Sequence, residues 1–278
     1  SLKVEKESKP MPFQFENSLE FAKSLDQGDQ LSHIREQFIL PSELAASGGS
    51  SCVYLAGNSL GLQPRKAKEY INAELEDWAK LGVEGHLHAR HAWLPYHEFV
   101  TDMSARLVGA KPSEVVVMNT LTVNLHLMMV TFYRPDKKRF KILVEGGSFP
   151  SDKYAVDSQA RFHGFEPNEA VVELWPRQGE KILRHEDIIA KIEELKDTLA
   201  LVMLGNVNYL TGQAFDLKSI ASSAHKVGAY CGTNLAHGAG NLHLKLHDWD
   251  LDFAMWCSYK YLNSGPGSLA GCFVHERH

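Results

Sequence analysis

The stretch LDFAMWCSYKYLNSG, residues 251–265, joins an apolar run to a group of polar side chains. Residues 251–257 are mostly apolar, which is typical of a strand buried on both faces of a parallel sheet. Lys260 then stands just past the strand end, beside Tyr259 and Asn263. A lysine placed in this way can hold an aldehyde cofactor as a Schiff base. For a lone lysine, however, the ordinary interpretation is a surface residue that flanks a strand.

A second segment changes that interpretation. The string GTNLAH, residues 232–237, follows another short apolar run upstream of Lys260. It occupies the place where enzymes with a pyridine aldehyde cofactor put the group that faces the ring nitrogen. Together the two segments favour a cofactor site over an incidental surface lysine.

Composition sets broad limits on the class of protein. The chain has 278 residues, of which 44% are hydrophobic and 23% are charged, and its net charge is −5. These values are ordinary for a soluble globular protein and give no basic footprint for nucleic acid. No apolar run is long enough for a membrane span, and the first residues lack a signal-peptide core. We therefore expect a cytoplasmic protein whose four cysteines are buried and reduced.

Strand-like and helix-like segments alternate along the chain. We expect an α/β fold whose mostly parallel sheet is covered by helices on both faces. Residues 1–50 are expected to form an N-terminal leader and helical arm, and residues 51–278 one large domain. The expected strands cover 53–55, 115–118, 140–144, 170–175, 199–204, 229–232, 253–257 and 271–275. The expected helices cover 64–82, 95–108, 121–133, 186–195 and 217–227, with a further helix near 151.

Polar motifs follow four of these strands, at 119–122, 148–152, 233–237 and 258–260. Ligands of parallel sheets collect at the carboxyl ends of the strands. The sequence therefore predicts that the four loops share one site.

Several strings, in one order along the chain, resemble the kynureninase family of fold-type-I pyridoxal-phosphate enzymes. They are GNSLGLQP at 57–64, LTVNLHL at 121–127, FPSD at 149–152, residues 209–213, LAH at 235–237, LHDW at 246–249, WCSYKYLN at 256–263 and FVHE at 273–276. Each string is weak alone, but the ordered set is specific. The resemblance implies hydrolytic cleavage of kynurenine or 3-hydroxykynurenine to alanine and the corresponding anthranilate, within tryptophan catabolism and NAD synthesis. It also implies pyridoxal 5'-phosphate as cofactor, a small amino-acid substrate and a homodimer.

The resemblance also implies roles for single residues. Lys260 attaches the cofactor and moves protons, and Tyr259 contacts the phosphate and assists proton transfer. The remaining assignments are phosphate binding for Leu121 and Thr122, ring stacking for Phe149, a cofactor hydrogen bond for Asp152, the pyridine nitrogen for Asn234, the phenolic side for His237, and substrate contact for Ser59 and His86. Without the resemblance, Thr122 and Asp152 are equally helix caps, Phe149 a core side chain and Tyr259 an aromatic at a strand end.

The chain also departs from the family pattern. The family has aspartate where this chain has Asn234, and an uncharged amide cannot favour a protonated pyridine ring. Smaller departures are Asn206, following Gly205, and Gly238. Family members also continue past His278 into a small C-terminal domain, so we expect that domain to be absent.

Two hypotheses follow for the function. The first is a kynureninase-type enzyme that binds its cofactor at Lys260. The second is a catalytically silent relative that acts as a binding or dimer-partner protein, motivated by Asn234 and the missing domain. A different pyridoxal-phosphate lyase or desulfurase is a weaker third. No metal site is expected, because His86, His88 and His91 fit no standard zinc spacing.

Overall fold

The computed structural model describes residues 14–42 and 52–278 and contains a seven-stranded sheet in the order β3-β9-β8-β7-β6-β4-β5. β9 runs antiparallel to both neighbours, whereas the pairs from β8 to β5 are parallel. The mostly parallel sheet is therefore confirmed. Its strands are β3 (Val115–Val117), β4 (Lys141–Glu145), β5 (Val171–Leu174), β6 (Leu199–Gly205), β7 (Tyr230–Asn234), β8 (Phe253–Cys257) and β9 (Ala270–Val274).

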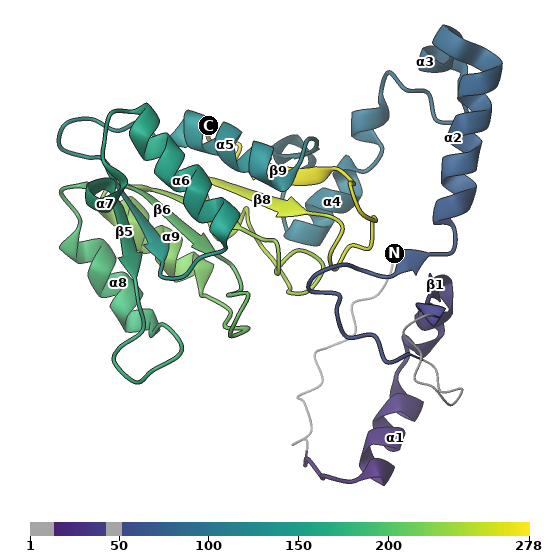
Figure 1. The fold of residues 1–278 in the computed structure, drawn as a ribbon, viewed down its shortest axis with the longest axis horizontal. Helices are drawn as coiled ribbons and strands as arrows, with labels where there is room; N and C mark the ends of the chain where they lie inside the picture. Colours follow the sequence, from purple (N-terminus) through teal and green to yellow (C-terminus); the bar gives the residue numbers. More distant parts are fainter. Residues whose placement is uncertain (1–13, 43–51) are drawn as a thin grey trace.

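Helices cover both faces of this sheet (Figure 1). On one face, α5 (Leu121–Phe132) and α6 (Pro150–Phe162) bury apolar side chains against the strands, and Phe132 stacks on Phe253 with ring centroids 4.7 Å apart. On the other face, α4 (Thr101–Val108), α8 (His185–Glu194) and α9 (Leu217–Lys226) pack over a second cluster that includes Ile188 and Ile220. Burial of all five residues of β8 explains why its sequence lacks polar alternation.

Local sequence signals start the helices that matter for the site. Thr120 caps α5, since its hydroxyl accepts a hydrogen bond from the backbone N–H of Val123, at 3.4 Å. Asp216 caps α9 in the same way through Ser219. Pro150 opens α6, where its missing N–H costs nothing. Short α7 (Pro167–Ala170) leads into β5.

The N-terminal part lies beside the sheet. It contains α1 (Leu19–Gly28), a 3-10 turn (Ser32–Gln37), α2 (Ala67–Leu81) and α3 (Gly85–His88). Figure 1 shows that α2 and α3 extend away from the sheet. β1 (Phe38–Ile39) and β2 (Gln63–Pro64) form a short antiparallel pair in this region.

Two expected elements differ from the structure. Residues 53–55 form no strand, because the segment pairs with no described strand and Val53 and Leu55 are exposed. The expected helix at 95–108 is a 3-10 turn (Tyr96–Glu98) followed by α4. The expected leader at 1–12 and small-residue loop at 45–51 lie outside the described residues.

All four cysteines are free thiols, and three of them are buried as expected, whereas Cys52 is only partly buried. The three buried cysteines belong to the sheet. They lie in the central strands: Cys231 in β7, Cys257 in β8 and Cys272 in β9. Burial raises the pKa of the Cys272 thiol to about 11, and it also raises the pKa of Cys257.

Candidate active site

A pocket of about 450 Å³ lies at the carboxyl ends of the parallel strands. Every site residue named from the sequence except His86 lines it: Ser59, Leu121, Thr122, Phe149, Asp152, Asn234, His237, Tyr259 and Lys260. The predicted convergence of four loops on one pocket is therefore a feature of the structure. Its size suits a small cofactor with part of a substrate.

Lys260 directs its amine toward the middle of this group. Its Nζ lies 3.0 Å from Nε2 of His237 and 5.9 Å from the centroid of the Phe149 ring. Burial, and then the charge of Lys260, hold the pKa of His237 below its ordinary value. His237 is therefore neutral near pH 7, and its Nε2 faces both the Lys260 amine and the carbonyl of Asn58, each at 3.0 Å.

A close backbone contact brings the segment at 57–62 to the pocket. The N–H of Gly61 donates to the carbonyl of Tyr259 at 2.8 Å. A Cβ on Gly61 would lie 2.3 Å from the carbonyl oxygen of Lys260, so only glycine fits here. The same segment places the carbonyl of Asn58 3.0 Å from Nε2 of His237, with Ser59 at the rim.

The first turn of α5 forms another wall. Leu121 and Thr122 are the first two residues of this helix, and both line the pocket. The free backbone N–H groups of a helix start, together with the helix dipole, favour a phosphate group. The chain enters this turn through Asn119, which has a left-handed φ of 54°.

Asn234 and Asp152 form a pair at the floor of the pocket. The Asn234 amide donates to Oδ2 of Asp152 at 2.5 Å, and its own oxygen accepts the N–H of Ala236 at 2.8 Å. The other Asp152 oxygen, Oδ1, is buried and has no hydrogen-bond partner within residues 14–42 and 52–278. Burial raises the pKa of Asp152, which the hydrogen bond from Asn234 and the charge of Lys260 partly offset. A carboxylate is thus present beside residue 234, where the sequence had suggested that charge was lost.

His86 lies elsewhere in this chain. It belongs to α3, and its ring packs edge-on against Trp93 with centroids 5.5 Å apart. The structure therefore does not bring His86 to the pocket that Ser59 lines.

Other residues that line the pocket were not predicted from the sequence. Glu145, at the end of β4, is buried and accepts a hydrogen bond from the Asn208 amide at 3.0 Å. Burial raises its pKa. Cys257 and Tyr209 also line the pocket. A polar residue directly after the apolar run at 140–144 was the available signal for Glu145.

Two of the departures from the family pattern compensate for each other. A Cβ on Gly238 would lie 1.9 Å from Oδ1 of Asn206. Asn206 is buried, and this oxygen has no partner among the described residues. The asparagine side chain therefore requires glycine at position 238.

Comparison with known proteins fits this geometry. Residues 48–269 match the family described as aminotransferase class-V. The chain belongs to the aminotransferase class-V family. Solved structures agree on the fold. A C-DES mutant with glycine covalently linked to its PLP cofactor aligns with a TM-score of 0.71 and 17% identity, over 87% of this chain and 60% of that one. The cysteine desulfurase of Thermococcus onnurineus NA1 aligns with a TM-score of 0.67 and 20% identity, over 88% of this chain and 57% of that one.

Curated relatives of this class-V chain are more similar in sequence. It is 65% identical to the kynureninase of Myxococcus xanthus (strain DK1622), over 96% of this chain and 62% of the relative. It is 49% identical to the kynureninase of Nematostella vectensis, over 94% of this chain and 58% of the relative. The chain thus spans about three fifths of the length of these relatives.

Pyridoxal 5'-phosphate is the cofactor of this class-V chain, and the pocket fits it. The start of α5 suits its phosphate, Phe149 its ring, and Lys260 its aldehyde. The unpartnered Oδ1 of Asp152 supplies an acceptor for a proton on a ring nitrogen. None of the described helices is long and apolar enough to cross a membrane.

Proposed function

We propose that this chain is the cofactor-binding part of a kynureninase, which hydrolyses kynurenine or 3-hydroxykynurenine to alanine and the corresponding anthranilate. The observation that carries the proposal is Lys260, whose amine lies 3.0 Å from His237 in the pocket that Phe149 and Asp152 also line. The high identity to curated kynureninases supports the choice of reaction.

The residues have separate tasks in this proposal. When bound, the cofactor draws electrons away from the substrate carbon. Lys260 holds the cofactor and moves a proton at that carbon, and neutral His237 keeps the lysine amine oriented through their 3.0 Å contact. Tyr259 assists at the phosphate. Ser59, at the rim, contacts the substrate.

The Asp152–Asn234 pair supports an active enzyme rather than a silent relative. The silent alternative rested on the loss of a carboxylate at position 234 and on the missing C-terminal domain, and the pair bears on the first of these grounds. The Asp152 carboxylate lies 2.5 Å from the Asn234 amide, and its other oxygen is buried without a partner among the described residues. We therefore assign Asp152 the charge that faces the ring nitrogen, with Asn234 as its positioning residue.

We test the cofactor site first. Purified protein with pyridoxal phosphate should show a visible absorption band, and borohydride reduction should fix the cofactor covalently on Lys260. Lys260→Ala should lose the band and the adduct, whereas Lys226→Ala, an exposed lysine at the end of α9, should keep both. A labelled lysine elsewhere, or a band that survives in Lys260→Ala, contradicts the assignment.

The reaction is tested separately by the release of fluorescent anthranilate from kynurenine. The protein used carries whatever sequence follows residue 278 in the natural protein. We expect turnover of kynurenine or its 3-hydroxy form by the wild-type protein and none by Lys260→Ala. A protein that binds the cofactor at Lys260 and turns over neither compound refutes the proposed reaction but not the site.

We also propose a homodimer in the cytoplasm that supplies NAD synthesis, with an arm at 1–50 and a cofactor domain at 51–278. Support for the dimer comes from α2, where Tyr70, Ile71, Leu75 and Trp78 are exposed and line a groove of about 970 Å³. Sedimentation should give twice the chain mass for wild type. Trp78→Glu should give the monomer mass, and Phe162→Glu, an equally exposed residue on α6, should not. A monomeric wild type contradicts the dimer.

A further inference from the structure

A second cluster of titratable side chains lies at the opposite ends of the strands, away from the cofactor pocket. Glu114 directly precedes β3, His247 lies in the loop before β8, and His275 directly follows β9. The amino ends of β3 and β8 and the carboxyl end of antiparallel β9 meet at this edge. The cofactor pocket lies at the other ends of these strands, so the cluster plays no part in it.

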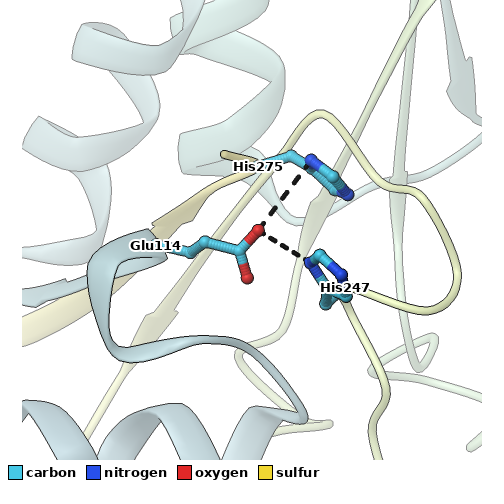
Figure 2. A group of neighbouring side chains, drawn as sticks. All are labelled: Glu114, His247 and His275. Atoms are coloured by element: carbon cyan, nitrogen blue, oxygen red, sulfur yellow. Dashed lines mark hydrogen bonds and ion pairs between the residues drawn. The ribbon is translucent and has the colours of Figure 1, made fainter. Parts of the chain in front are cut away.

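The three side chains converge on one point (Figure 2). Nδ1 of His247 lies 2.9 Å from Oε1 of Glu114, and Nδ1 of His275 lies 3.8 Å from the same oxygen. The two imidazole rings are nearly parallel, with centroids 4.8 Å apart and an interplanar angle of 15°. One donor atom from each residue falls within 4.8 Å of the others.

These separations match a tetrahedral metal site. Zinc bonds of about 2.0–2.1 Å to nitrogen and oxygen place neighbouring donors about 3.3 Å apart. The observed separations of 2.9 and 3.8 Å lie on either side of that value. The two stacked rings would have to turn out of their near-parallel arrangement to place all three donors on one ion, and water would complete the coordination.

The surroundings hold the carboxylate ready for this role. The Glu114 side chain is fully buried, and its oxygens accept the backbone N–H groups of Lys111 at 2.8 Å and Glu276 at 2.9 Å. Outer contacts of this kind orient metal ligands.

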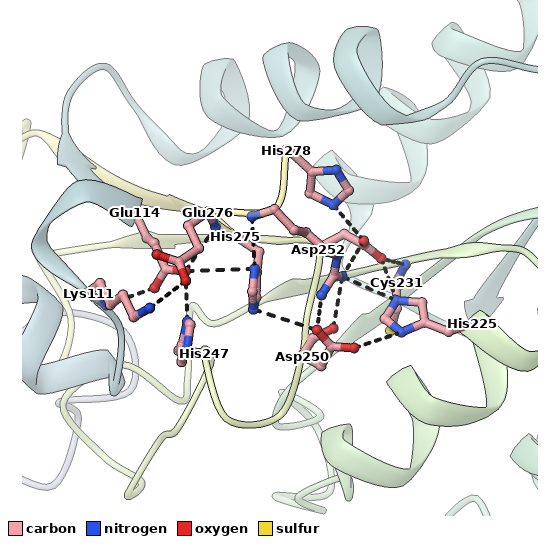
Figure 3. A network of polar contacts seen from close by, with 11 residues as sticks. Lys111, Glu114, His225, Cys231, His247, Asp250, Asp252, His275, Glu276 and His278 are labelled. Atoms are coloured by element: carbon pink, nitrogen blue, oxygen red, sulfur yellow. Dashed lines mark hydrogen bonds and ion pairs between the residues drawn. The ribbon is translucent and has the colours of Figure 1, made fainter.

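The tautomer of His275 leaves Nδ1 without a proton. This nitrogen accepts the backbone N–H of Arg277 at 3.2 Å, so its proton sits on Nε2, and an ion bound at Nδ1 would replace the Arg277 contact. Nε2 in turn faces Oδ1 of Asp250 at 3.6 Å. A carboxylate behind a ligating histidine is a common outer partner of zinc sites. Figure 3 shows how these residues continue into a wider polar network around Asp250 and Asp252.

We propose that Glu114, His247 and His275 bind a divalent transition-metal ion of the zinc class, at a site separate from the cofactor pocket. Imidazole and carboxylate donors suit zinc and cobalt rather than calcium or magnesium. Nδ1 of His247 donates its proton to Glu114 in the structure. When the ion binds, this proton moves to Nε2, so that Nδ1 can coordinate the ion. The ion ties the segment after β9 to the segments before β3 and β8, so it stabilises the folded chain.

Cobalt and zinc titration of chelator-treated full-length protein tests the site. We expect one equivalent of Co²⁺ to give the visible absorption of a tetrahedral ion, and Zn²⁺ to displace it. His247→Gln and His275→Gln should each weaken binding at least tenfold, and Asp250→Asn by about 10–100-fold. His88→Gln, an exposed histidine on α3, is the matched control and should bind as wild type does.

Each other outcome overturns the proposal. Binding that His88→Gln removes, or that His247→Gln leaves unchanged, means an adventitious ion only. A wild-type protein that binds neither metal at millimolar concentration means a purely hydrogen-bonded cluster. If the variants do not fold, anomalous diffraction from zinc-soaked wild-type crystals decides the matter, and no peak between the three residues overturns the site.

Discussion

Replacing Asn234 by aspartate is the most direct test of the pair at the pocket floor. The amide nitrogen of Asn234 donates to Asp152 at 2.5 Å, so Asn234→Asp sets two carboxylates face to face. Two unit charges 4 Å apart repel by about 4 kcal/mol in a protein environment of effective dielectric 20. In the folded variant the two carboxylates avoid this repulsion by sharing one bound proton. In the unfolded chain the same proton is lost once the pH exceeds the normal carboxyl pKa.

That proton sets the size and the sign of the effect. A carboxyl group kept protonated at pH 7, against an unfolded pKa of about 3.9, costs at most about 4 kcal/mol. Because the folded variant binds one more proton than the unfolded chain, its free energy of unfolding falls as pH rises, by up to about 1.4 kcal/mol per pH unit. The free energy of unfolding of the variant should therefore equal that of wild type near pH 4 and be lower by roughly 2–4 kcal/mol at pH 7.

Urea unfolding of the cofactor-free protein between pH 4 and pH 8 measures this difference. Asn241→Asp, an exposed asparagine whose amide donates to the carbonyl of His237, is the matched control and should show no such slope. Bound cofactor should recover part of the loss, since a protonated ring nitrogen faces the pair. A difference under about 0.5 kcal/mol at pH 8, or the same slope in the control, refutes the reasoning.

Three further predictions concern the same pocket. Gly238→Ala should lower the free energy of unfolding by about 1–3 kcal/mol, because the added Cβ would clash with the Asn206 side chain. Adding Asn206→Ala should restore the stability, and additive losses in a double-mutant cycle would contradict this reasoning. Gly61→Ala should push its segment away from the Lys260 carbonyl and weaken cofactor affinity in fluorescence titrations, so an unchanged affinity argues against the close contact. Asp152→Asn should leave the circular dichroism spectrum unchanged but lower the affinity for the cofactor about tenfold, which corresponds to roughly 1.4 kcal/mol for one charge-assisted contact. An affinity equal to that of wild type would show that this carboxylate does not face the ring.

The sequence predicted the sheet well because its strands carry continuous apolar runs. The strings at 199–204 and 253–257 leave few alternatives to buried strands, and polar residues after them locate the pocket. The segment at 53–55 carries a similar short pattern but remains exposed, since a strand needs a partner that local sequence cannot reveal.

Contacts between distant residues were not predictable in the same way. Asn234 and Asp152 are 82 positions apart, so the sequence alone suggested a lost charge where the fold supplies one. Glu114 and His247 are 133 positions apart, and no spacing rule joins them. The role expected for Ser59 and His86 came from resemblance alone, and within one chain only Ser59 reaches the pocket.

The buried thiols of the central strands have a practical consequence. Cys231 in β7 and Cys272 in β9 are shielded from reagents and held in the unreactive thiol form by burial, whereas Cys257 in β8 lines the pocket. Alkylation of Cys231 and Cys272 therefore requires the sheet to open. Mass spectrometry of pulse-alkylated protein would time that opening strand by strand, with no probe introduced, and would reveal whether the layer behind Lys260 separates as one unit.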